Sequence, residues 1–465
     1  MGFPVSWKNK GTESRFAFVG LRQVILIAAI MLFYSDVFSG VIRYVWHSIG
    51  VEFLTYIPMI TVSAVTILYL AYSGFRTVYD ARITMVILFI FSFAVIGLFM
   101  GRAPEGVFFA LYTWGPFFLG MMAVRFDLFP RIMKHVPLLT VLALAGVFVT
   151  ALTTVPWMGG EGYSIGGVEV EITRNWDAFG VSRLPGFSRA SYTAANHLTV
   201  FALWLLCTRM SVFWKAVLWG AAGYAILLTT SKTPLIVIAA APPLLLGYTL
   251  LSRTGKWARV YSYGVVAVIL AIMIGLPLMG EINKGGGRIH LPYDDIFPFL
   301  RMESFADRVE NMWPNAFRLL DVDGPVAHVL GRGLSGIGVG QKFTEMDIIN
   351  SGDNMHVFLY ITFGMFSSLF YAALLLGHKR AMDRFPKTSQ GMPPVFYLAT
   401  VTAVLGLGTL TCVIESILPV FAFGAMVALC VAPLPARKVV RREPAWQLFE
   451  SVQESTAAPA PVNSI

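Results

Sequence analysis

The chain has 465 residues, of which 56% are hydrophobic and 13% are charged. An average soluble domain has about 45–50% apolar and about 25% charged residues, so this composition excludes an ordinary soluble enzyme. Because a membrane-crossing helix takes about 20 apolar residues, the chain holds enough for roughly twelve crossings and leaves few residues for a separate soluble domain.

Apolar segments of helical length recur along the whole chain. This pattern favours transmembrane helices over the alternating ten-residue strands of an outer-membrane barrel. We therefore expect an all-α integral membrane protein with about twelve transmembrane helices. The expected spans are 18–34, 53–72, 83–100, 107–124, 136–155, 192–206, 213–230, 233–251, 260–279, 355–376, 395–413 and 417–431.

Basic residues alternate between the two sides of this arrangement. The loops on one side carry two to four Lys and Arg each, whereas the opposite short loops carry only Arg43, Arg102 and Lys232. Lys and Arg are retained on the cytoplasmic side during insertion, so both termini are expected in the cytoplasm. The same loops account for the net charge of +9, and no nucleic-acid partner is needed to explain it.

Residues 1–433 are predicted to form one polytopic membrane domain, followed by a basic cytoplasmic tail, 434–465. This tail is rich in Ala, Pro and Ser at its end and is expected to be disordered. Two long loops, about 157–191 and 281–354, fall on the outer side. The second loop, between the ninth and tenth helices, is predicted to carry short amphipathic helices, one of them over 304–320.

Two clusters of polar residues lie at the outer ends of the sixth and eighth spans. Arg183 and Arg189 lead into the sixth span, where guanidinium forks suit a phosphate, although a snorkelling interfacial arginine is the alternative. Lys232 follows a tight hairpin and would lie at the outer membrane surface. A cation there is costly unless it faces a polar cavity or a ligand, although it could also serve only to set the topology.

Two further clusters flank the second long loop. Arg308 lies in the amphipathic stretch, and Arg332 lies in a glycine-rich turn that could approach an anion. Asp353, Asn354 and His356 precede the tenth span. His356 could accept a proton near neutral pH, and the alternative is a capping Asp with an interfacial His.

Together, the four clusters predict one outer face that is rich in cations and has one candidate base. Such a face suits a reaction in which a diphosphate leaves and a hydroxyl attacks. It carries no acidic cluster resembling a hard-metal site, so we expect metal-independent chemistry without a cofactor. The three cysteines, Cys207, Cys412 and Cys430, lie in apolar runs and are expected to act as small hydrophobic residues.

Several motifs in the second half of the chain follow one another in a recognisable order. They are Arg183-x-x-Gly186, Leu228-Thr-Thr-Ser231-Lys232, Arg308 with Trp313 and Ala316, Gly331-x-Gly333, and Asp353-Asn354-x-His356-x-Phe358-Leu359 ending in Gly364. In this order the chain resembles the O-antigen ligase and Wzy-type polysaccharide polymerase superfamily of GT-C-like membrane glycosyltransferases.

The resemblance implies a bacterial inner-membrane enzyme that uses a polyprenyl-diphosphate-linked glycan, such as one on undecaprenyl diphosphate. The glycan would pass to an acceptor hydroxyl with inversion at the anomeric carbon. Arg183 and Lys232 would hold the diphosphate, with Arg189 competing for that role, and His356 would position or deprotonate the acceptor. Arg308 would bind donor or acceptor, and the remaining expected substrate-binding residues are Arg332, Asp353 and Asn354.

A polymerase of exopolysaccharide or O-antigen repeat units is preferred, because the Asp353-Asn354 pair resembles polymerases more than ligases. The alternatives are a ligase that transfers the glycan to lipid A core and, from a different class, a secondary transporter, although the halves show no repeat symmetry. Further expected partners are membrane lipids, a flippase and a chain-length regulator.

Overall fold

The computed structural model describes residues 13–158, 162–165, 168–174, 177–178, 181–282, 303–345, 348, 350–384 and 394–432. About 81% of the described residues are helical, which confirms the prediction of a mainly α-helical protein. They belong to one unit, Met1–Ala432. The tail, Pro433–Ile465, is a second unit, and the disorder predicted for it concerns residues outside the described part of the chain.

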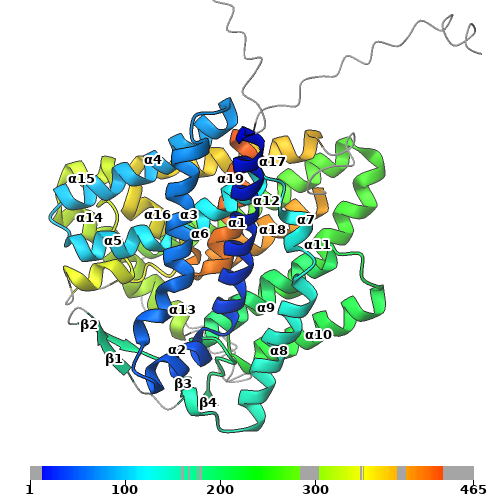
Figure 1. Ribbon diagram of the computed structural model, residues 1–465, viewed down its shortest axis with the longest axis horizontal. Helices are drawn as coiled ribbons and strands as arrows, with labels where there is room; N and C mark the ends of the chain where they lie inside the picture. Colours follow the sequence, from blue (N-terminus) through cyan, green and yellow to red (C-terminus); the bar gives the residue numbers. More distant parts are fainter. Residues whose placement is uncertain are drawn as a thin grey trace, which may run out of the picture. The chain divides into compact units, whose positions relative to one another are not determined.

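The first half of the chain forms a series of helices and two small β-ribbons (Figure 1). In chain order the helices are α1 (Glu13–Val37), α2 (Ser39–Ser48), η1 (Glu52–Tyr56), α3 (Ile57–Ser73), α4 (Val78–Phe99), α5 (Pro104–Thr113), α6 (Gly115–Arg125), α7 (Phe129–Ile132), α8 (Val136–Leu152), η2 (Pro156–Met158), α9 (Ser191–Leu206) and α10 (Val212–Leu228).

The second half continues with long apolar helices and a group of short helices between them. These are α11 (Lys232–Leu251), η3 (Ser252–Thr254), α12 (Lys256–Ile282), α13 (Glu303–Asp307), η5 (Arg308–Met312), α14 (Trp313–Val322), α15 (Pro325–Leu330), η6 (Val339–Phe343), α16 (Met355–Phe363), η8 (Gly364–Ser367), α17 (Ser368–Arg384), α18 (Pro394–Gly408), η9 (Val413–Glu415) and α19 (Ile417–Val431).

A helix occurs at each of the twelve expected spans, but only seven helical segments in the described part of the chain are long and apolar enough to cross a membrane. Four more apolar helices have 15 to 17 residues, and α9 has 16. At 1.5 Å per residue, such helices rise about 23–26 Å, less than the roughly 30 Å hydrocarbon core. The apolar runs thus predicted the positions of the helices more accurately than their lengths.

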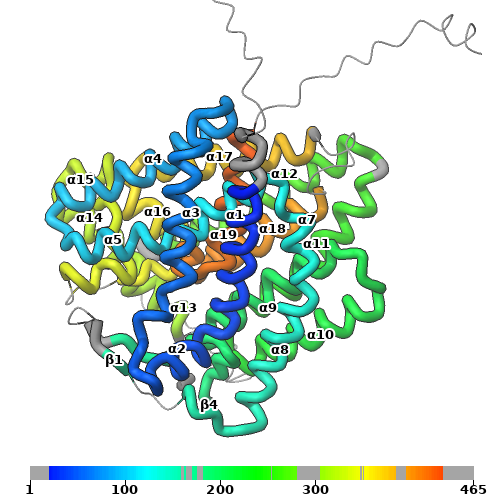
Figure 2. Tube along the Cα trace, viewed as in Figure 1, coloured from blue at the N-terminus to red at the C-terminus, as the bar shows by residue number. Residues whose placement is uncertain are grey.

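Glycines bring the central helices into close contact. Gly120 of α6 lies against the backbone of Phe421, and Gly424 of α19 lies against the backbone of Phe117, so the two helix axes approach closely. The first and last described helices also meet, since the rings of Phe33 and Phe421 pack edge to face at 4.8 Å. Figure 2 shows α1 passing beside α19 in the middle of the unit.

The first long loop contains strands, which the all-α prediction did not include. Strands β1 (Gly162–Ile165) and β2 (Val168–Glu171) pair antiparallel, as do β3 (Asp177–Ala178) and β4 (Val181–Ser182). The ribbon is tied to α2, because Arg43 Nη1 donates to the Tyr163 hydroxyl at 2.7 Å. Strands this short give almost no periodic signal in the sequence.

The amphipathic helix expected over 304–320 is present, but it is not a regular α-helix throughout. Helices α13 and α14 flank a π-helical stretch, η5, that begins at Arg308. The extra residue in a π turn changes the direction of the side chains around it, and such turns are frequent at functional sites. Val309, Trp313 and Ala316 form its buried face.

Candidate functional site

The loop that carries Arg183 is fastened to α8 at Gly186. This glycine has φ +64 and lies so close to Gly146 and Val147 that a Cβ would come within 3.0 Å of the Val147 nitrogen. Trp157 Nε1 donates to the Gly186 carbonyl at 2.9 Å. These contacts fix the backbone three residues after Arg183, so its position is set by the fold.

Ser188 continues the anchoring of this loop toward α1 and α9. Its hydroxyl donates to the Val37 carbonyl at 3.2 Å and lies 3.3 Å from His197 Nδ1. On the other side of the ring, His197 Nε2 lies 2.7 Å from an Asp36 carboxylate oxygen. All three polar side chains are buried, so this Ser–His–Asp chain joins three segments inside the protein.

Arg308 is held opposite the start of α16. Its Nη2 donates to an Asp353 carboxylate oxygen at 2.8 Å, and its Nη1 donates to the carbonyl of Ser304 at 2.8 Å. Asp353 adopts φ +27, and the preceding Gly352 carbonyl accepts a hydrogen bond from Trp313 Nε1 at 3.1 Å. The buried Trp313 therefore braces the turn that presents Asp353.

Arg183 lies in the segment before α9 and Arg308 begins η5, and the two lie close enough to act on each other electrostatically. Burial and the Arg308 charge lower the pKa of Arg183. The Nε atoms of both arginines are buried without a hydrogen-bond partner among the described residues. A pair of guanidiniums with one nearby carboxylate and two unused donors is suited to an anion with several oxygens.

Arg189 belongs to a neighbouring group of arginines. Burial, together with the charges of Arg43 and Arg174, lowers the pKa of Arg189. Its Nε donates to the Glu171 carbonyl at 3.2 Å. The sequence indicated Arg43 only as a loop cation and did not indicate Arg174, and both add positive charge around Arg189.

Lys232 lies at the end of α11 nearest these loops. Near the start of α11, Val237 packs against Gly406, which is close to the end of α18. Farther along α11, the Leu244 carbonyl accepts a hydrogen bond from the Tyr261 hydroxyl, near the beginning of α12. Helix α11 therefore begins on the side of the 409–416 connection. Its first residue, Lys232, is partly buried there.

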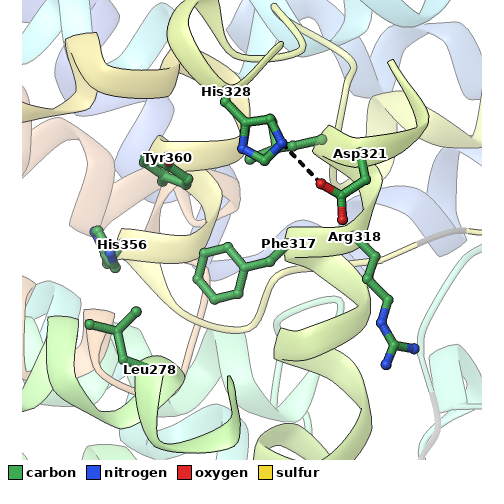
Figure 3. A pocket seen from close by; sticks show the side chains of 8 residues that line it. Leu278, Phe317, Arg318, Asp321, His328, His356 and Tyr360 are labelled. Atoms are coloured by element: carbon green, nitrogen blue, oxygen red, sulfur yellow. Dashed lines mark hydrogen bonds and ion pairs between the residues drawn. The ribbon is translucent and has the colours of Figure 1, made fainter. Parts of the chain in front are cut away.

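His356 faces a cavity of about 410 Å³ (Figure 3). Its Nδ1 lies 2.8 Å from the Tyr371 hydroxyl, and its Nε2 has no partner among the described residues. In Figure 3 the Arg318 guanidinium extends away from the space, while Asp321 and His328 form a pair at its edge. The lining residues are Leu278, Phe317, Arg318, Leu320, Asp321, His328, His356 and Tyr360.

The predicted site residues are thus only partly brought together. The structure joins Arg308 with Asp353 and brings Arg183 near them, but the residues that line the His356 cavity include neither Arg183 nor Lys232. The joint action of Arg183, Lys232 and His356 therefore stays a prediction. His356 follows Asp353 by three residues, yet its ring turns toward α12, α14 and α15.

Two of the expected substrate-binding residues have structural partners. The Arg332 guanidinium is fully buried and is paired with Asp323 at 2.8 Å and Glu345 at 2.7 Å, a cluster that Arg102 completes. Asn354 caps α16 and donates from Nδ2 to the carbonyls of Met273 and Thr409. These side chains build the scaffold of the site in this conformation.

Glu415 is a candidate functional residue that the sequence did not reveal. It lies in η9, between α18 and α19, and one of its carboxylate oxygens accepts from the Val339 backbone nitrogen at 2.7 Å. The only sign of it in the sequence was a single carboxylate between two apolar segments. The pattern alone could not show that it faces the turn before η6.

Comparison with protein families, characterised proteins and solved structures found no match.

Proposed function

We propose that the chain is a membrane glycosyltransferase that polymerises repeat units of exopolysaccharide or O-antigen. The donor is a glycan on polyprenyl diphosphate, and the acceptor is a sugar hydroxyl at the outer leaflet. The observation that carries this proposal is the Arg183–Arg308 pair with its two unpartnered Nε donors. A diphosphate would supply the negative charge and the acceptor oxygens for this cationic pair.

The proposed topology has twelve spans, with both termini in the cytoplasm of a bacterial inner membrane. The seven long apolar helices support a membrane location. The shorter helices α8, α9, α10, α18 and α19 would then cross a locally thinned bilayer or lie within the protein. Under this topology, the loops that carry Arg183, Arg308 and Glu415 face the periplasm.

One group of residues binds the leaving diphosphate, and another residue positions the acceptor sugar. Arg183 and Arg308 bind the diphosphate, Lys232 adds charge from α11, and Asp353 orients Arg308 through their ion pair. The diphosphate leaves with the electron pair of the bond to the anomeric carbon, so nearby cations lower the barrier. His356, which lines the cavity, positions the acceptor sugar from the other side.

The test is an assay of the purified protein in lipid nanodiscs with a polyprenyl-diphosphate-linked repeat unit, analysed by mass spectrometry. Lipid-linked chains two or more repeats long are expected from the wild type and not from Arg183→Ala. Transfer only after lipid A core is added would assign the protein to the ligases. Transport of the intact glycan lipid by protein in sealed liposomes, without a new glycosidic bond, would instead identify a transporter.

A further inference from the structure

The Glu415 carboxylate is held by a hydrogen bond at one of its two oxygens. Oε1 accepts a hydrogen bond from the Val339 backbone N–H. The preceding residue, Gly338, has φ +80 and lies against the same oxygen. A Cβ on residue 338 would come within 2.3 Å of Oε1, so glycine is needed for this approach. Oε2 has no hydrogen-bond partner among the described residues.

The charged groups that act on Glu415 come from three other segments. They are Arg174 from the segment after β2, Lys342 from η6 and Asp353 from the turn before α16. Burial is the largest influence and raises the pKa of Glu415 to about 7, although the Val339 N–H and the two cations oppose it. Its own loop adds Cys412, whose thiol is buried beside it.

Asp353 connects Glu415 to the arginine pair. The same carboxylate that binds Arg308 acts electrostatically on Glu415, and Arg308 acts in turn on Arg183. His356 has a different environment, since its cavity is lined by residues of α12, α14, α15 and α16 and by no residue of η9. Of the two candidate bases, Glu415 is therefore the one that shares neighbours with the proposed diphosphate site.

We propose, on the basis of the proposed transferase function, that Glu415 is the catalytic base and that His356 only positions the acceptor. Oε2 accepts the proton of the acceptor hydroxyl while that oxygen forms the bond to the anomeric carbon. The bond from the anomeric carbon to the phosphate oxygen breaks, and its electron pair leaves with polyprenyl diphosphate. The proton then passes from Glu415 to water.

Glu415→Gln is the most informative variant, because its amide oxygen can still accept the Val339 N–H while the group can no longer take a proton. We expect kcat to fall by about 10²- to 10⁴-fold, as for loss of a general base, with little change in KM. Wild-type kcat should rise with pH through about 7, and the residual activity of the variant should lack this rise. The matched control is Glu105→Gln, at an exposed carboxylate of α5.

Glu415→Asp keeps the ionisable group on a shorter side chain and should retain more activity than Glu415→Gln, together with a pH-dependent rise. Wild-type activity in Glu415→Gln, or an unchanged pH profile in that variant, would overturn the assignment. Loss of the rise in His356→Gln instead would also overturn it and would make His356 the base. No product from the wild type at any pH would refute the transferase function itself, which is a distinct result.

Discussion

Arg308 and Asp353 are 45 positions apart in the chain and form an ion pair of 2.8 Å between Nη2 and a carboxylate oxygen. The pair joins the π-helical turn at η5 to the turn before α16. Asp353 balances the charge of Arg308 but not that of Arg183, so the two arginines retain a net positive charge. This relationship sets both the geometry and the charge of the proposed diphosphate site.

The Arg308–Asp353 pair should behave as one unit in catalysis. Arg308→Ala is expected to lower kcat/KM by about 10- to 100-fold, the effect of losing a charge-assisted hydrogen bond of about 1.5–3 kcal/mol. Asp353→Ala should cost less, because Arg308 is still present but is no longer oriented. A double-mutant cycle measured on kcat/KM should show coupling, and strictly additive effects would mean that the pair has no joint role.

The buried cluster of Arg102, Asp323, Arg332 and Glu345 should contribute strongly to stability. Asp323→Asn leaves two nearly buried guanidiniums short of a counter-charge, and breaking such a pair costs about 3–5 kcal/mol. Asp321→Asn is the matched control, since Asp321 pairs with His328 at the surface and should change stability little. Thermal unfolding in detergent compares the two, and equal melting temperatures would contradict the role of the cluster.

The same cluster should make the protein sensitive to acid. Burial raises the pKa values of Asp323 and Glu345, but hydrogen bonds and charges from Arg332 and Arg102 outweigh it and hold them below the usual 3.8 and 4.5. Their contribution is thus complete above about pH 4.5 and is lost as pH falls through the lower folded-state values. Glu345→Gln should show a shallower decline of melting temperature below that pH than the wild type. A parallel decline in both proteins would contradict this explanation.

Gly186 should be essential for the position of Arg183. Alanine at its φ of +64 is strained and its Cβ would crowd the backbone of α8, so Gly186→Ala should cost about 1–3 kcal/mol and weaken donor binding. Gly220→Ala, at an open position of α10, is the matched control and should leave donor binding unchanged and raise stability by at most about 1 kcal/mol. Melting temperature and donor affinity measure the two effects. Tight donor binding by Gly186→Ala would show that this loop does not position the donor.

Much of the helical arrangement could be predicted from hydrophobicity, because each apolar run, such as 417–431, becomes a helix. The length of a helix was harder to predict, since α18 ends at Gly408 although its apolar sequence continues to Val413. The ribbon of β1 and β2 was missed, because four-residue strands such as Val168–Glu171 carry too few alternations to be recognised. The hydrogen bond from Arg43 of α2 to Tyr163 of β1 is a tertiary contact that such a short segment does not reveal.

The candidate site was predicted less completely, because its contacts join distant parts of the chain. The sequence indicated Arg183, Arg308 and Asp353 as functional residues, but it could not show that Arg332 would be neutralised by Glu345 in a buried cluster. It also could not show that Glu415, far along the chain, would lie near Asp353. Side-chain direction at the start of α16 turned His356 away from these groups, and no periodicity in the sequence reports that direction.

Preferential binding of a diphosphate lipid is the property that the Arg183–Arg308 pair should confer. Native mass spectrometry of the protein should show tighter binding of undecaprenyl diphosphate than of undecaprenyl monophosphate, because the second phosphate meets a second guanidinium. Arg183→Ala and Arg308→Ala should each remove this preference, whereas Arg318→Ala, whose guanidinium extends away from the cavity in Figure 3, should keep it. Equal binding of both lipids by the wild type, or an undiminished preference in the Arg183 and Arg308 variants, would contradict a diphosphate site at this pair.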